Sequence, residues 1–183
     1  MKKIKNTRFI AAAGMIGALY VALTMLSALF GLSSGAVQVR LSEMLCVLPI
    51  FTAAAIPGVT VGCFIANLVV GGTVWDIVFG TLATLIGAVA AYFMRHFRYL
   101  AFIPTVVSNM VIIPVVLILS GVGGWELFPY FTLTVGLGEL VSCGAFGCAL
   151  IFYFDKHPGI AAKLFEWTER SAVSENRTRT GDK

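Results

Sequence analysis

Long apolar blocks dominate this sequence and limit the folds open to it more than any other feature. They cover residues 9–30, 45–70, 77–93, 99–122 and 128–154. A helix needs about 20 apolar residues to cross the hydrocarbon core of a bilayer. Only 12% of the 183 residues are charged, against roughly 25% in soluble domains. The sequence therefore predicts an all-α integral membrane protein and excludes a soluble globular domain.

The basic side chains predict the topology. Every Lys and Arg except Arg40 lies before residue 9, between residues 95 and 98, or after Asp155. If the chain forms a bundle of about six transmembrane helices, these three regions share one side of the membrane. The positive-inside rule assigns that side to the cytoplasm, so the N and C termini are predicted to be cytoplasmic. The position of these charges beside apolar helices also argues against binding to nucleic acid.

Helix boundaries follow from the breaks between the apolar blocks. We expect a membrane domain over residues 1–155 and a cytoplasmic tail over residues 156–183, weakly amphipathic at first and then disordered. The expected helices cover approximately residues 8–30, 42–56, 58–71, 76–94, 99–119 and 129–154. Pro57-Gly58 is a strong turn signal. The two short helices that it separates could be tilted spanning helices or a re-entrant hairpin.

Polar side chains at membrane depth mark the candidate binding site. An ionisable group there is costly unless it is paired or hydrated, so it is by default a candidate for function. The candidate substrate-binding residues are Gln38, Arg40, Glu43, Asn67, Trp75, Asp76, Asn109 and Glu139. Most fall in the outer third of the membrane, whereas the inner halves of the helices carry almost no charge. We therefore expect a polar pocket that opens to the outside, where Trp75 could stack on a flat ring.

Structural roles could explain several of these residues. Gln38 and Arg40 could be loop residues among the lipid headgroups, and Asp76 could complement a helix dipole. Glu43 could form a salt bridge with Arg40, because a three-residue spacing places both on one helical face. The two asparagines could hydrogen-bond between helices. Glu139 is harder to explain, since a carboxylate about ten residues into an apolar helix needs a partner or a proton.

The charge balance of the candidate site indicates the kind of ligand. The carboxylates of Glu43, Asp76, Glu126 and Glu139 face the single guanidinium of Arg40. This excess favours a ligand that is rich in hydrogen-bond donors or positively charged. The sequence has no nucleotide-binding loop, no catalytic motif and no metal-binding cysteine pattern. Uptake against a concentration gradient would therefore require an ion gradient or a partner protein.

Small residues in the first helix predict a docking surface for such a partner. Pairs of small residues four positions apart let another helix approach closely in lipid, although internal packing would explain the same pattern. The residues concerned are Ala13, Gly14, Gly17, Ala18 and Ala22.

Several motifs occur in an order that is typical of one family. They are Ala18-Leu19-Tyr20-Val21-Ala22-Leu23-Thr24, Gln38-x-Arg40-x-Ser42-Glu43, Ile56-Pro57-Gly58 with Gly62 and Asn67, Asp76-x-x-x-Gly80-Thr81-x-x-Thr84, and later Asn109 and Gly138-Glu139. With these motifs, residues 10–155 resemble the queuosine-precursor transporter family, QueT. Its members are substrate-binding S-components of energy-coupling factor (ECF) transporters.

The resemblance implies an S-component in a bacterial plasma membrane that captures 7-aminomethyl-7-deazaguanine, or a close analogue, at its outer face. It also implies a membrane T-component and a pair of cytoplasmic ATPases that use ATP, whereas this chain itself holds no cofactor. Two other transport functions stay open: an S-component for another vitamin-like solute, and a stand-alone gradient-driven transporter. The second would more naturally place ionisable groups along both halves of its path. An intramembrane enzyme would need reactive groups beyond carboxylates and amides.

Overall fold

The computed structural model describes residues 2–31, 39–161 and 164–165, and in this part of the chain it is helical with no β-strand. Four helical segments are long and apolar enough to cross a membrane: Thr7–Leu29, Asp76–Phe93, Arg98–Leu119 and Trp125–Lys156. Two shorter apolar helices, Leu41–Ile50 and Ala55–Val70, accompany them. The prediction of an all-α, multi-pass membrane protein is confirmed.

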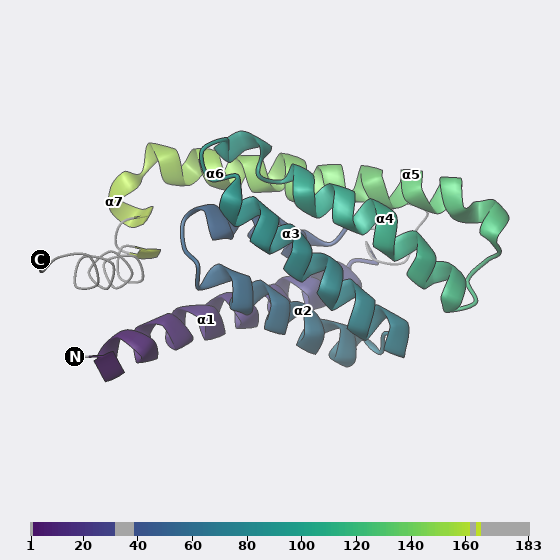
Figure 1. Cartoon of the computed structure of the whole chain (residues 1–183), viewed down its shortest axis with the longest axis horizontal. Helices are drawn as coiled ribbons and strands as arrows, with labels where there is room; N and C mark the ends of the chain where they lie inside the picture. Colours follow the sequence, from purple (N-terminus) through teal and green to yellow (C-terminus); the bar gives the residue numbers. More distant parts are fainter. Residues whose placement is uncertain (1, 32–38, 162–163, 166–183) are drawn as a thin grey trace, which may run out of the picture.

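The helical elements are interrupted by short segments of other helical geometry. In chain order they are α1 (Lys2–Leu29), η1 (Leu41–Ile50), α2 (Ala55–Val70), η2 (Asp76–Gly80), α3 (Thr81–Phe93), η3 (Arg98–Leu100), α4 (Ile103–Leu119), η4 (Trp125–Leu127), α5 (Phe128–Glu139), η5 (Leu140–Phe146), α6 (Gly147–Lys156) and α7 (Pro158–Ala161). η1, η3 and η4 are 3₁₀-helices, and η2 and η5 are π-helical. η2 continues directly into α3, and α5, η5 and α6 form one uninterrupted rod (Figure 1).

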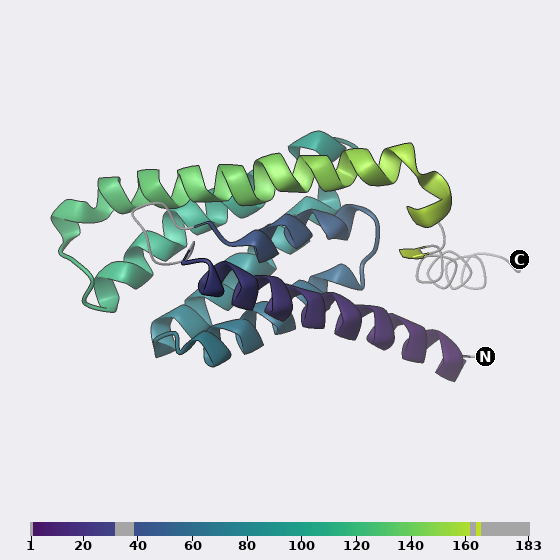
Figure 2. The same ribbon diagram turned by 180° about the vertical axis from the view of Figure 1, so that it is seen from behind.

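The 3₁₀-helix η1 lies at the centre of the bundle. It contacts α1, α3, η5 and α6, and Figure 2 shows it between α1 and the rod formed by α5, η5 and α6. Its residues from Leu45 to Ile50 are all buried. A 3₁₀-helix rises about 2.0 Å per residue, so its 10 residues are too short to cross a hydrocarbon core of about 30 Å. η1 therefore serves as an internal element that brings polar residues to the middle of the protein.

The break between η1 and α2 lies earlier than predicted. We expected it at Pro57-Gly58, with helices over residues 42–56 and 58–71, but the helix is interrupted at residues 51–54 and α2 already begins at Ala55. Pro57 thus lies in the first turn of α2, where backbone N–H groups have no intrahelical acceptor and proline is tolerated. Pro57-Gly58 is therefore not a turn in this structure, and the prediction of a break there is wrong.

Glycines bring α1 and α2 into close contact. A Cβ atom on Gly17 would lie 3.0 Å from the carbonyl oxygen of Gly58, and one on Gly62 would lie 2.9 Å from that of Gly17. Small residues allow such an approach of two backbones, which strengthens packing where lipid supplies no hydrophobic driving force. In contrast, a Cβ atom on Gly14 would meet nothing within 4 Å. The predicted docking residues therefore divide between internal packing and an exposed face.

Elements that are far apart in sequence meet at one end of the bundle. The start of α1 and α7 both lie there (Figures 1 and 2). At that end, Nη1 of Arg98 lies 2.6 Å from Oδ1 of Asp155, and the ring of Phe165 stacks on that of Phe51 with centroids 5.5 Å apart. The assignment of this end to the cytoplasm stays a prediction. Most of the predicted tail lies outside the described residues.

Candidate functional site

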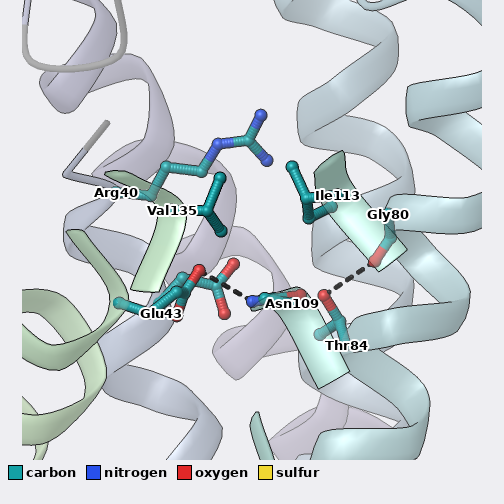
Figure 3. A pocket seen from close by; sticks show the side chains of 8 residues that line it. Arg40, Glu43, Gly80, Thr84, Asn109, Ile113 and Val135 are labelled. Atoms are coloured by element: carbon teal, nitrogen blue, oxygen red, sulfur yellow. Dashed lines mark hydrogen bonds between the residues drawn. The ribbon is translucent and has the colours of Figure 1, made fainter. Parts of the chain in front are cut away.

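A small polar cavity lies between η1, η2, α3, α4 and α5, inside the apolar bundle. Its lining consists of Arg40, Glu43, Gly80, Thr84, Asn109, Ile113, Val135 and Glu139 (Figure 3). We call it the inner cavity. Its volume of about 30 Å³ is enough for a water molecule. Four of the predicted site residues, from elements far apart in sequence, therefore meet around one cavity.

Glu43 is buried in this cavity and both of its carboxylate oxygens accept hydrogen bonds. The hydroxyl of Tyr20 donates to Oε1 at 2.5 Å, and the thiol of Cys46 donates to Oε2 at 3.1 Å. Glu43 is only 2% exposed. The possible salt bridge to Arg40 is thus replaced by two neutral donors, one of which comes from α1. A carboxylate with both oxygens bonded in this way is held firmly in place.

Glu139 is also buried, but its hydrogen bonding is incomplete. The amide nitrogen of Asn109 donates to Oε1 at 2.7 Å, a bond drawn as a dashed line in Figure 3. The other oxygen, Oε2, is buried and has no hydrogen-bond partner among the described residues. Buried polar atoms are nearly always satisfied, so each exception calls for an explanation.

Arg40 lines a second, larger cavity as well as the inner one. The outer cavity has a volume of about 170 Å³ and is lined by Thr24, Arg40, Asn67, Val70, Gly72, Asp76 and Leu117. Nη1 of Arg40 donates to Oδ1 of Asn67 at 3.3 Å, and Nδ2 of Asn67 donates to the carbonyl oxygen of Asp76 at 3.1 Å. Arg40 is the residue common to both linings. Movement of its side chain would therefore change the shape of both cavities.

Asp76 has a structural role at the start of a helix. Its Oδ2 accepts from the backbone N–H and the hydroxyl of Thr73, at 3.0 and 2.7 Å, while its own N–H donates to that hydroxyl at 3.3 Å. This reciprocal arrangement is a capping box, with Asp in the position usually held by Glu or Gln. Asp76 thus satisfies donors at the helix N-terminus as well as lining the outer cavity.

Two further predicted residues do not join these cavities. Trp75 is 44% exposed, and its ring stacks on Phe79 with centroids 5.8 Å apart. It belongs to the lining of neither cavity. The expectation that Trp75 stacks on a bound ring is therefore not supported by its position. Gln38 lies outside the described residues.

Buried polar residues of α1 were missed as site residues. Tyr20 bonds to Glu43, and the hydroxyl of Thr24 donates to the hydroxyl of Ser42 at 2.8 Å. Tyr20, Thr24 and Ser27 are all buried. Their spacing of four and three places them on one helical face. A polar face on an otherwise apolar helix could have identified these residues in the sequence. This face of α1 packs against η1.

Both π-helical segments adjoin the inner cavity. η2 ends at Gly80, which lines it, and η5 begins directly after Glu139. A Cβ atom on Gly80 would lie 3.2 Å from Nδ2 of Asn67, so a larger residue would press on the amide that holds Arg40. π-helical turns occur frequently at functional sites. No group of three or more His, Cys, Asp or Glu in the described part of the chain could hold a metal ion.

Comparison with known proteins identifies the family. Residues 10–156 match the family model described as the QueT transporter. The chain belongs to the QueT transporter family. The predicted resemblance is confirmed, and a QueT transporter is a transport protein rather than an enzyme.

A curated relative belongs to the same family. The queuosine precursor transporter QueT of Lactococcus lactis subsp. cremoris is 41% identical over 87 residues, which are 47% of this chain and 50% of the relative. The match thus spans about half the length of that protein. No solved structure matches the chain.

Proposed function

We propose that this QueT-family protein binds a queuosine precursor, 7-aminomethyl-7-deazaguanine or a close analogue, as the S-component of an ECF importer. The observation that carries the proposal is the pair of buried carboxylates, Glu43 and Glu139, in the lining of one cavity. A deazaguanine presents adjacent N–H donors, and its aminomethyl group adds a cation. Carboxylates in an apolar setting recognise both kinds of group through charge-assisted hydrogen bonds.

The size of the cavities indicates how the ligand enters. Sites for small organic molecules usually have volumes of about 300–1,000 Å³. The inner cavity, at about 30 Å³, and the outer cavity, at about 170 Å³, are each smaller than this. Binding would therefore require the side chains around the cavities to move, and Arg40, which lines both, is the first candidate. The long, flexible side chain of an arginine permits such a movement.

Energy for uptake would come from partner subunits. The chain has no nucleotide-binding loop, so we assign ATP hydrolysis to a pair of cytoplasmic ATPases that act through a membrane T-component. Docking would use the face of α1 that carries Gly14, Ala18 and Ala22, all of which are exposed. In a bacterial plasma membrane this face would otherwise contact lipid.

The most direct test is ligand binding by the purified full chain in lipid nanodiscs. Titration calorimetry should show saturable binding of 7-aminomethyl-7-deazaguanine, and native mass spectrometry after gentle purification should show a retained purine-like ligand with T-component and ATPase subunits. Riboflavin, thiamine and biotin serve as controls for other vitamin-like solutes. Tight binding of one of these controls without binding of the deazaguanine would contradict the assigned substrate.

A further inference from the structure

We infer that Glu139, oriented by Asn109, reads the N–H donor edge of the ligand ring, while Glu43 is a positioning residue that shapes the cavity. This inference rests on the proposed function and deepens it, because it assigns different tasks to carboxylates that look equivalent in sequence. The distinction depends on three features of the inner cavity: the hydrogen bonds of each carboxylate, the amide beside Glu139, and the apolar side chains above it.

The first feature is the unpartnered oxygen of Glu139. Glu139 is 8% exposed, and its Oε2 has no hydrogen-bond partner in the described part of the chain. Such an atom is costly in the folded protein, because the hydrogen bonds it made with water are lost and not replaced. A ligand N–H that reaches Oε2 would supply the missing donor. Oε2 can therefore accept a hydrogen bond from a bound molecule without losing one to the protein.

In Glu43, by contrast, neither carboxylate oxygen lacks a hydrogen-bond partner. Its Oε1 already accepts from the hydroxyl of Tyr20 and its Oε2 from the thiol of Cys46. These bonds connect η1 to α1 and hold the carboxylate in one orientation. Its charge still contributes to the acidic character of the cavity, but its geometry is determined by the protein rather than by the ligand.

The second feature is Asn109, whose side-chain amide lies beside the Glu139 carboxylate, so that the two together offer hydrogen-bond donors and acceptors. One amide hydrogen of Asn109 bonds Oε1 of Glu139. An asparagine amide has two N–H donors and a carbonyl acceptor, and Asn109 also lines the cavity. The carboxylate and the amide together can therefore accept and donate at adjacent positions. This pattern complements the N–H and C=O groups on one edge of a guanine-type ring, whereas an ammonium group needs acceptors alone.

The third feature is the apolar part of the lining. Ile113 and Val135 flank the cavity in Figure 3, with Arg40 above them and Asn109 below. Two aliphatic side chains on opposite sides form walls that suit the faces of a flat ring. A ring held between them would direct one edge toward Asn109 and Glu139.

The test compares ligand preferences of the wild type with those of Glu139→Gln and, as the matched control, Glu43→Gln. Each is titrated with 7-aminomethyl-7-deazaguanine, with its analogue lacking the 2-amino group, and with the nitrile that replaces the aminomethyl group. Glu139→Gln should weaken binding of the first compound about 10- to 100-fold, the range expected for a hydrogen bond to a charged group. It should also erase the preference for the 2-amino compound and retain the preference for the amine over the nitrile. Glu43→Gln should keep the preference for the 2-amino compound.

The inference is overturned if Glu139→Gln instead erases the amine preference, since Glu139 would then face the aminomethyl group. It is also overturned if the variant binds all three compounds as the wild type does. Both results differ from failure of the proposed function, in which the wild type itself would bind none of the compounds.

Thermal unfolding of the ligand-free protein provides a readout that does not depend on the ligand. Glu139→Gln should leave the melting temperature unchanged or raise it, because a neutral amide costs less to bury without a partner than a carboxylate. Glu43→Gln should lower it, because Tyr20 and Cys46 lose an anionic acceptor. An equal decrease for both variants would show that Glu139 is structural and would contradict the inference.

Discussion

At the scale of single residues, the hydrogen bond between Tyr20 and Glu43 joins elements that are distant in the sequence. The hydroxyl of Tyr20 donates to Glu43 at 2.5 Å, and Tyr20 is only 1% exposed. The bond fixes η1 against the middle of α1. Because η1 carries one side of the inner cavity, this contact determines the shape of the cavity as well as the packing.

Removal of the Tyr20 hydroxyl should destabilise the protein. Tyr20→Phe leaves Oε1 of Glu43 without its donor, and an unsatisfied buried group costs about 1–3 kcal/mol, or more where it is charged. We expect a lower melting temperature in nanodiscs and weaker ligand binding. Tyr130→Phe is the control, since Tyr130 is 50% exposed and should unfold like the wild type. Equal melting temperatures for the two variants would show that the hydrogen bond contributes nothing to stability.

At the scale of helical elements, the capping box at Thr73 stabilises the start of the helix formed by η2 and α3. Thr73→Ala removes the hydroxyl contacts with Asp76 and Ser120, and Thr73 itself lines neither cavity. Loss of an N-cap typically costs about 1 kcal/mol. The variant should therefore melt at a lower temperature and bind the ligand within about twofold of the wild-type affinity. A large loss of affinity without a change in melting temperature would assign Thr73 to ligand binding.

The two faces of α1 should respond differently to bulky substitutions. Gly17→Leu would drive α1 from α2, because even a Cβ atom there lies 3.0 Å from a carbonyl oxygen. Gly14→Leu meets nothing within 4 Å, so folding and ligand affinity should stay normal. If this exposed face docks the T-component, Gly14→Leu should nevertheless abolish ATP-driven uptake, because close helix approach needs small residues.

Uptake assays with all ECF subunits, together with melting curves of each variant alone, test this difference. Normal uptake by Gly14→Leu would remove this face of α1 from the docking surface. A loss of ligand affinity in the same variant would instead show that the face packs inside the protein.

At the scale of the whole molecule, the chain should bind its substrate but should not concentrate it. The four long apolar segments and two shorter helices account for most of the described residues, and they include no nucleotide-binding loop. Liposomes that contain only this protein should therefore show no accumulation of labelled 7-aminomethyl-7-deazaguanine under a proton or sodium gradient. Addition of the T-component and ATPases, with ATP, should restore uptake. Gradient-driven accumulation by the chain alone would identify a secondary transporter.

The sequence by itself determined the class of the protein and the set of polar residues at its centre. Apolar blocks of this length cross a membrane as helices, because a helix supplies a hydrogen-bond partner for each backbone N–H and C=O group within the same segment. Polar residues are so scarce in these blocks that Glu43, Asn109 and Glu139 stood out individually. The family resemblance rested on the same residues.

Only the tertiary structure decided how these residues are paired. Sequence spacing identifies neighbours three or four positions apart on one helix, and this led to the possible pairing of Glu43 with Arg40. Cys46, three positions from Glu43, is a partner of this local kind, but Tyr20 and Asn109, which also bond the two carboxylates, are 23 and 30 positions away. Contacts across such separations depend on how helices pack, and here they depend on η1, whose 3₁₀ geometry and central position no periodicity predicted. The same packing left Oε2 of Glu139 without a partner among the described residues, because no described donor from the surrounding helices reaches it.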